Sequence, residues 1–263
     1  ILEKEGGTDM AKVITITCQK GGVAKTTTAL ALASGLYSRG KKILLIDTDP
    51  QSNTSYTLGI DLLNVPTLYE VLRKEKTVND VIFPVRMGFD VLPGSLSLAL
   101  ADMEFSQTGR EYLLRESLTE IQERYDYIVI DTPPSLGILT MNALTASNYV
   151  IVPVQADVYS LQGIGQLSQT MQTVKRYCNP GLTIAGILIT RYNSRAVLSK
   201  DMAAMLDDTA KALNTMLFKT KIRECIAIKE AQAQQMDIFT YAPKSNAAKD
   251  YDNMIEELME VVK

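Results

Sequence analysis

A glycine-rich segment with a lysine and three threonines stands near the start of the chain. Residues 18–28 read Cys-Gln-Lys-Gly-Gly-Val-Ala-Lys-Thr-Thr-Thr, after a short apolar run and directly before an Ala/Leu-rich helical pattern. A strand, a glycine turn and a helix N-terminus together offer backbone N–H groups and the positive end of a helix dipole, which suits a triphosphate. In such a loop Lys25 would neutralise β- and γ-phosphate charge, and the Thr26 hydroxyl would ligate Mg²⁺.

The match to the usual phosphate-loop pattern G-x-x-x-x-G-K-[ST] is incomplete. Gln19 and Ala24 occupy its two glycine positions. Taken alone, the segment also fits a glycine turn capped by threonines. Further elements are therefore needed to identify a nucleotide site.

Two other apolar runs end in carboxylates. Residues 127–131 read Tyr-Ile-Val-Ile-Asp, and Thr-Pro-Pro-Ser-Leu-Gly follows as a candidate switch loop. A carboxylate at the end of such a strand is what Mg²⁺ coordination in a P-loop enzyme requires. Residues 43–51, Ile-Leu-Leu-Ile-Asp-Thr-Asp-Pro-Gln, add Asp47 and Asp49 beside the same phosphates. One strand that ends in Asp usually means a turn or a helix cap, but three correctly ordered elements predict a nucleotide site.

Strand and helix patterns alternate along nearly the whole chain. Short β-branched runs, each typical of a buried strand, lie at residues 13–17, 42–47, 89–92, 127–131, 149–154 and 183–189. Helical patterns lie at residues 26–38, 67–74, 110–124, 138–146, 161–177, 197–217 and 247–262. This alternation predicts an α/β fold with a doubly wound, mainly parallel sheet and helices on both faces. Ligands of such sheets lie beyond the carboxyl ends of the strands, where the three motifs are.

The composition excludes several classes of protein. The chain of 263 residues is 46% hydrophobic and 22% charged, which is ordinary for a globular protein and unlike a disordered or collagen-like one. It has no histidine, so an imidazole base or a His-ligated metal is excluded. The three cysteines, Cys18, Cys178 and Cys225, lack C-x-x-C spacing, which argues against a disulfide framework or a zinc or iron–sulfur site. We therefore expect a soluble protein of a reducing cytoplasm.

No repeat, low-complexity tract or linker divides the chain, so we expect one domain over residues 10–263. Residues 1–9 are polar and acidic, unlike a signal peptide, and Met10 is the first plausible initiator. We interpret residues 1–9 as a leader or a remnant of expression. Charge is uneven along the rest: the net charge is −3, yet residues 173–249 hold 12 basic and 6 acidic side chains. Such a segment suits a polyanion or is merely a solvated surface.

The three motifs make the chain resemble the ParA/Soj/MinD family of P-loop ATPases. Residues 20–26, 47–51 and 131–137 resemble its deviant Walker A, Walker A′ and Walker B motifs, and the similarity covers essentially everything from Met10 onward. The chain is most similar to short Soj-type ParA proteins. The resemblance implies the P-loop NTPase fold and an ATP- and Mg²⁺-dependent hydrolase of the cytoplasm and nucleoid. It also implies an ATP-dependent homodimer that binds double-stranded DNA without sequence preference and segregates a plasmid or chromosome with a ParB-type partner.

The resemblance also implies roles for individual residues. Lys20 would be the signature lysine that reaches the nucleotide of the other subunit, as an arginine finger does in trans. Asp49 would orient the attacking water beside the metal, while Thr26 and Asp131 hold Mg²⁺ directly and through water. Gly21 would lie where the two subunits approach closely, so a side chain there should block dimerisation. The expected nucleotide-binding residues are Lys20, Gly21, Gly22, Val23, Ala24, Lys25, Thr26 and Thr27.

Some positions depart from the family pattern. Ala24 stands where a glycine usually precedes the Walker lysine, and it costs roughly 1 kcal/mol if that position needs a positive φ. Relatives usually have a Pro-Arg pair whose proline commonly helps to hold adenine, and in its place this chain has Ile222-Arg223-Glu224-Cys225. An arginine a few positions on is replaced by Ala227. The sequence therefore assigns no adenine contacts.

DNA binding is expected from the basic segment. Arg195 best matches a DNA-contacting arginine of Soj-type relatives. Other basic residues that could join it are Arg191, Lys200, Lys219, Lys221, Arg223 and Lys229. Binding of this kind neutralises phosphates and weakens steeply with salt.

Three alternatives remain. A MinD-like membrane or cargo-positioning ATPase would need an amphipathic C-terminal helix with a basic polar face. Here Tyr251, Met254 and Leu258 belong to an apolar stripe, whereas the polar face carries Asp250, Asp252, Glu256, Glu257 and Glu260, which favours core packing. A metal-cluster reductase would need paired cysteines. The third alternative is a module that holds nucleotide without hydrolysing it.

Overall fold

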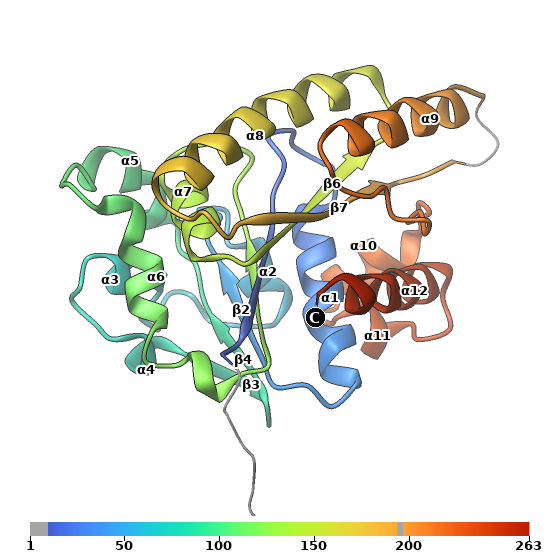
Figure 1. Cartoon of the computed structure of the whole chain (residues 1–263). Helices are drawn as coiled ribbons and strands as arrows, with labels where there is room; N and C mark the ends of the chain where they lie inside the picture. Colours follow the sequence, from blue (N-terminus) through green and yellow to red (C-terminus); the bar gives the residue numbers. More distant parts are fainter. Residues whose placement is uncertain (1–9, 194–196, 263) are drawn as a thin grey trace, which may run out of the picture.

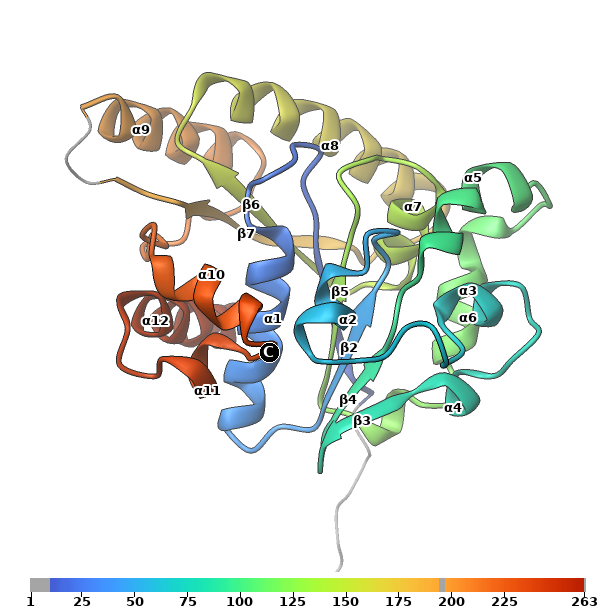
Figure 2. The same cartoon turned by 180° about the vertical axis from the view of Figure 1, so that it is seen from behind.

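The computed structural model describes residues 10–193 and 197–262, which build a seven-stranded sheet with helices on both faces (Figure 1, Figure 2). The strand order is β3-β4-β2-β5-β1-β6-β7. All neighbouring strands are parallel except β3 and β4. The strands are β1 (Lys12–Ile16), β2 (Ile43–Asp47), β3 (Phe83–Arg86), β4 (Phe89–Leu92), β5 (Tyr127–Asp131), β6 (Tyr149–Gln155) and β7 (Thr183–Thr190). The expected doubly wound, mainly parallel α/β sheet is confirmed.

The helices differ widely in length. The longer ones are α1 (Lys25–Ser38), α7 (Ile138–Ala146), α8 (Val158–Tyr177), α9 (Val197–Ala212), α10 (Ile226–Ala233) and α12 (Asn246–Val261). The shorter ones are α2 (Asn53–Thr57), α3 (Leu68–Leu72), α4 (Val78–Val81), α5 (Ala101–Glu104), α6 (Leu113–Leu118) and α11 (Ile238–Tyr241). Three 3₁₀ turns complete the set: η1 (Leu96–Leu100), η2 (Arg110–Tyr112) and η3 (Gln122–Arg124). In the described part of the chain, no helix is both long and apolar enough to cross a membrane.

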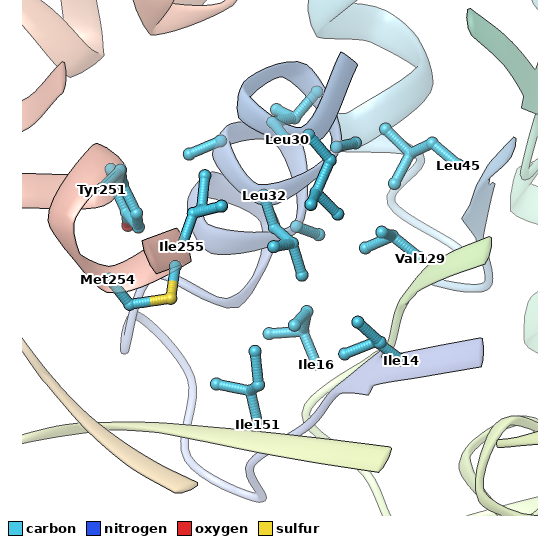
Figure 3. Close-up of a cluster of buried hydrophobic side chains, with 14 of the residues drawn as sticks. Ile14, Ile16, Leu30, Leu32, Leu45, Val129, Ile151, Tyr251, Met254 and Ile255 are labelled. Carbon is cyan, nitrogen blue, oxygen red and sulfur yellow. The ribbon is translucent and has the colours of Figure 1, made fainter. Parts of the chain in front are cut away.

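The strands bury both of their faces, as parallel strands between two helix layers must. Successive side chains of a strand point to opposite faces, so alternate residues enter different cores. In β2, Ile43 and Leu45 join the core under α1 and α12, while Leu44 and Ile46 join the core under α3, α6 and α7. A third core lies between the sheet and helices α8 and α9. Figure 3 shows strand side chains of the first core around α1, with Ile14, Ile16 and Ile151 below it and Leu45 and Val129 beside it, across from Tyr251 and Ile255.

Helix α12 packs closely against α1. A Cβ built on Gly35 would lie 2.3 Å from Ile255 Cδ1, so a larger residue here would force the Ile255 side chain to move. The hydroxyls of Thr28 and Tyr251 lie 3.1 Å apart and are both buried. The expected apolar stripe of the last helix is thus buried in the core, where each large side chain contributes about 1.5–3 kcal/mol. Asp250, expected on the polar face, is buried as well and pairs with Arg223.

Several element predictions were incomplete. The edge strand β3 was missed because it is four residues long, contains Pro84 and pairs antiparallel on a partly exposed edge. Helices α2, α4, α5, α10 and α11 were also missed. The helix expected at 110–124 is interrupted, so that α6 stands between two 3₁₀ turns, and the one expected at 197–217 ends at Ala212. These segments are short or irregular, and their limits follow from tertiary packing instead of periodicity.

Candidate functional site

The carboxyl ends of β1, β2 and β5 bring three loops together at one edge of the sheet. In the strand register Asp131 lies opposite Ile16 of β1 and opposite Asp47 of β2. The loops of residues 17–24, 48–52 and 132–137 therefore leave the sheet side by side. The three motifs of the sequence meet in space as their order predicted.

A cleft of about 450 Å³ opens beside these loops. One side, here called the P-loop wall, consists of Gly21, Gly22, Ala24, Lys25, Thr26, Thr27 and Asp49. The facing side, here called the C-terminal wall, consists of Ile222, Arg223, Glu224, Cys225, Ile228, Lys229 and Gln232. The cleft is of a size that holds a small organic ligand.

The backbone of the P-loop wall is shaped for an anion. Gly22 has φ +74° and Ala24 has φ +64°, both in the left-handed region. Ala24 is the N-cap of α1, and no side chain caps that helix. Loop amides and the free N-terminus of a fourteen-residue helix form the kind of nest that binds phosphate. The positive φ expected at Ala24 is present, with a strain cost of about 1 kcal/mol relative to glycine.

Lys25 is a buried cation at the start of α1. It is 7% exposed, and its Nζ donates to the carbonyl oxygen of Lys20 at 3.1 Å. Burial lowers the pKa of Lys25, while the nearby acidic groups of Cys18, Asp131 and Asp49 act in the opposite direction. A cation that has lost most of its water binds an anion strongly, because screening by solvent is weak there.

Asp47 and Asp131 are a fully buried pair of carboxyl groups. Asp47 Oδ2 accepts hydrogen bonds from the backbone N–H of Ser55 at 2.9 Å and from its hydroxyl at 2.7 Å. Asp131 Oδ2 accepts from Thr54 Oγ1 at 2.8 Å, whereas Asp131 Oδ1 is buried and has no hydrogen-bond partner in the part of the chain that the structure describes. Burial raises the pKa of both carboxyl groups. The nearby charge of Asp47 raises the pKa of Asp131 further, and that of Asp49 raises the pKa of Asp47. An orphaned buried carboxylate oxygen fits a nearby cation with its water shell.

Thr26 and Asp49 complete the polar end of the cleft. The Thr26 hydroxyl lies close enough to Asp131 to lower the pKa of that carboxyl group, against the larger effect of burial. Asp49 is 9% exposed, lines the cleft and accepts a hydrogen bond from the backbone N–H of Gln51 at 2.9 Å. A hydroxyl, two carboxylates and an open cleft are a donor set that suits Mg²⁺.

Thr54 and Ser55 are polar site residues that sequence reasoning missed. Both lie on the short helix α2, and each is 0% exposed. They hold the two buried carboxylates in place from one side. A run of small hydroxyl residues directly after Asp-Pro-Gln was the available signal.

Lys20 is not among the described residues that line the cleft. Its Nζ forms an ion pair with Asp157 at the start of α8, and the Tyr159 ring centroid lies 5.9 Å from the same nitrogen. Partial burial acts to raise the pKa of Asp157, but the contact with Lys20 holds this pKa below its ordinary value. Within its own subunit the lysine therefore contacts α8.

The structure divides the basic residues expected to bind DNA. Arg191, Arg223 and Lys229 line the cleft. Lys221 lies over the Tyr192 ring at 4.6 Å from its centroid. Arg195 lies outside the described residues, and Lys200 belongs to α9, with its side chain outside them too. Part of the basic surface expected to bind DNA therefore lies at the cleft.

Ion pairs shape the C-terminal wall. Arg223 binds Asp250 with Nε at 2.9 Å and Nη2 at 2.6 Å, which is a two-pronged contact with α12. Arg191 binds Glu224 at 3.0 Å. The apolar residues Ile222 and Ile228 line the same cleft. An apolar surface with polar flanks suits a planar ring, and it lies where the sequence departs from the family's Pro-Arg pair and assigned no adenine contact.

The sequence matches known proteins along nearly its whole length. A family model described as an AAA domain matches residues 11–184. The protein named sporulation initiation inhibitor protein Soj, from Bacillus subtilis (strain 168), is 38% identical over 252 residues, which cover 95% of this chain and 98% of that protein. The chromosome partitioning protein ParA of Myxococcus xanthus (strain DK1622) is 36% identical over 259 residues, which cover 97% of this chain and 90% of that protein.

The fold also matches solved structures. Cobyrinic acid a,c-diamide synthase from Mycobacterium smegmatis, solved with bound ADP and magnesium, superposes with a TM-score of 0.82 at 32% identity. The match covers 95% of this chain and 95% of that one. This similarity supports the assignment of the cleft to a nucleotide.

Proposed function

The chain belongs to the ParA/Soj family of P-loop ATPases, and from that membership we propose that it is a Mg²⁺-dependent partition ATPase. Its ATP-bound form pairs two subunits and binds DNA without sequence preference, and hydrolysis stimulated by a ParB-type partner releases the DNA. One observation carries the proposal. Three phosphate-site loops meet at one cleft in a chain 36–38% identical to partition proteins.

The P-loop wall performs the chemistry of its own subunit. The amides of residues 21–26 and the buried ammonium of Lys25 bind the β- and γ-phosphates. Thr26 and Asp131 would hold Mg²⁺, which neutralises phosphate charge. Asp49 orients the water that attacks the γ-phosphorus, so that a P–O bond forms as the bond to ADP breaks. Thr54 and Ser55 keep the buried carboxylates in position.

Lys20 supplies the dimer dependence. A lysine that lies outside its own cleft can place its charge on the transferring phosphoryl group of a second subunit. Turnover then requires two subunits, and a monomer with bound ATP hydrolyses it slowly.

Gly21 offers a test of the dimer that spares the monomer. Among the described residues, a Cβ built on Gly21 meets nothing within 4 Å, so Gly21→Val should fold and bind ATP. In the proposed dimer that side chain faces the second subunit. We expect the variant to remain monomeric with a non-hydrolysable ATP analogue, as measured by sedimentation velocity. A variant that dimerises like the wild type contradicts this arrangement.

DNA binding follows from the segment of residues 173–249, with 12 basic and 6 acidic side chains. We propose that Arg195, Lys200 and Lys221 contact DNA phosphates. Arg191, Arg223 and Lys229 add positive potential from the rim of the cleft, although Arg191 and Arg223 are partly neutralised by their acidic partners. Contacts with phosphate carry no sequence information, which suits non-specific binding.

Binding to random-sequence duplex DNA tests the function. Wild-type protein is measured with ATP, with ADP and without nucleotide, over a series of salt concentrations. We expect retention only with ATP and a steep loss of affinity as salt rises. A dimer that forms with ATP but ignores DNA overturns the proposal and favours a membrane or protein tether.

Two charge reversals sharpen that experiment. Arg195→Glu should lose DNA binding and retain ATP binding. Lys244→Glu makes the same change of charge at an exposed lysine of the same segment and should lose much less. Equal losses in the two variants indicate an effect of total charge instead of a contact.

A further inference from the structure

The ion pair between Lys20 and Asp157 joins the P-loop to the start of α8. Lys20 Nζ binds Asp157 Oδ2, and each side chain is 29% exposed. The P-loop is tied to the same segment a second time, because Gln155 Nε2 donates to the carbonyl oxygen of Gly22 at 2.9 Å. Lys20, which does not line the cleft of its own subunit, is therefore held close to that cleft.

The carboxylate of this pair is fixed in place by helix α8. Asp157 is the N-cap of the twenty-residue helix, and its Oδ1 accepts from the backbone N–H of Ser160 at 3.0 Å and from the Ser160 hydroxyl at 3.2 Å. The other oxygen remains for Lys20. The helix cap thus presents a charge to the lysine without the loss of freedom that a loose side chain would suffer.

The pair lies at a surface that a second molecule can reach. Val158 and Tyr159, at the same turn, are 64% and 74% exposed. The Tyr159 ring also contacts the lysine nitrogen, 5.9 Å from its centroid. Partly exposed pairs of this kind are weak, so the contact can break when a stronger anion competes for the lysine.

We propose that Asp157 is a positioning residue that holds Lys20 within its own subunit until the phosphates of a second copy displace it. The proposal rests on the proposed function, in which Lys20 acts across a dimer. The held lysine cannot serve another nucleotide, so each dimer forms only after two ion pairs break. Asp157 therefore raises the protein concentration at which the ATP-bound form pairs, and it keeps isolated subunits inactive.

Asp157→Asn tests the holding contact directly. Asparagine is as good an N-cap as aspartate, so α8 keeps its cap while the charge is lost. In the nucleotide-free protein we expect acetic anhydride to label Lys20 about threefold faster in the variant, since a free amine reacts faster than one held by a carboxylate. Mass spectrometry gives the rate, with Lys41 and Lys42 as internal references. Unchanged labelling of Lys20 overturns the proposal.

The same variant tests the consequence for dimerisation. Sedimentation velocity with AMPPNP gives the protein concentration at which half of the subunits are paired. We expect this midpoint to fall about threefold to tenfold in Asp157→Asn, because two weak pairs no longer need to break. Ser160→Ala removes a hydroxyl contact of the cap but leaves the ion pair, and its midpoint should match the wild type.

The outcomes separate this inference from the proposed function. A wild-type dimer whose midpoint is unchanged or higher in Asp157→Asn overturns the inference alone, and a higher midpoint shows that Asp157 assists pairing. A wild type that stays monomeric with AMPPNP overturns the proposed function, and the role of Asp157 with it.

Discussion

The P-loop wall and the C-terminal wall face each other across one cleft but are built in different ways. The P-loop wall takes its shape from backbone conformation and from buried charges, with Lys25 7% exposed and Asp49 9% exposed. The C-terminal wall takes its shape from side-chain ion pairs, and the Arg191 and Arg223 side chains are 49% and 46% exposed. Charges that are shielded from water act more strongly. Phosphate binding should therefore depend on the first wall far more than on the second.

Removal of the buried lysine should have the largest effect. Lys25→Met takes away the buried charge that we propose binds the phosphates, and we expect ATP binding to weaken by about 1000-fold, as for a truncated partner of a buried charge pair. Titration of a fluorescent ATP analogue measures the affinity.

The matched control lies on the other wall. Lys229→Met removes a cation that lines the same cleft. It should weaken ATP binding less than about tenfold, because its charge is screened by solvent. Equal losses in the two variants contradict the proposed difference between the walls.

Asp49→Ala should separate binding from hydrolysis. The carboxylate orients water in the proposed mechanism, so turnover should fall by about 100-fold while ATP affinity changes less than about threefold. Phosphate release under saturating ATP gives the turnover rate, and the variant should accumulate as a DNA-bound dimer. Normal turnover would remove Asp49 from its proposed role.

Loss of the Arg223 anchor should have a moderate effect. Asp250→Asn weakens the two-pronged contact between α12 and the C-terminal wall. We expect the free energy of unfolding to fall by about 1–2 kcal/mol, as for hydrogen bonds to charged groups. Urea unfolding measures the stability, and ATP affinity should fall only severalfold. A loss as large as that of Lys25→Met shows that the C-terminal wall also governs phosphate binding.

A change at Ala24 should have the smallest effect. Glycine at this position relieves about 1 kcal/mol of left-handed strain but gains about as much freedom in the unfolded chain. Ala24→Gly should therefore change the free energy of unfolding by less than about 0.5 kcal/mol. The reverse change, Gly22→Ala, is the control. Gly22 also has positive φ, and the described residues leave open space around it, so this variant should destabilise the protein through backbone strain alone. Stability equal to wild type in both variants would contradict the strain argument.

The P-loop wall was predictable from the sequence because its parts are local. A strand, a turn and a helix start within residues 12–28, and the register of β1, β2 and β5 follows from three apolar runs. The order of the motifs along the chain was therefore enough to place Lys25, Asp49 and Asp131 near one another. The mainly parallel sheet followed from the same alternation of patterns.

The C-terminal wall was not predictable, since it depends on contacts between distant segments. Arg223 pairs with Asp250, and both had been assigned to surfaces on the basis of their charge. Helix α10 is eight residues long and takes its place from packing beside the cleft. The partner of Lys20 was also missed, because nothing in the sequence places Asp157 opposite the P-loop.

Mixed dimers test the central claim, that one catalytic site uses residues of two subunits. Lys20→Ala and Asp49→Ala proteins, each expected to have little turnover alone, are combined in equal amounts with ATP. In a mixed dimer the Lys20→Ala subunit keeps its Asp49 and receives Lys20 from its partner. Our account predicts recovery to about a quarter of wild-type turnover, because half of randomly formed dimers are mixed and each has one complete site. If mixing restores no turnover, Lys20 acts within its own subunit and the account is wrong.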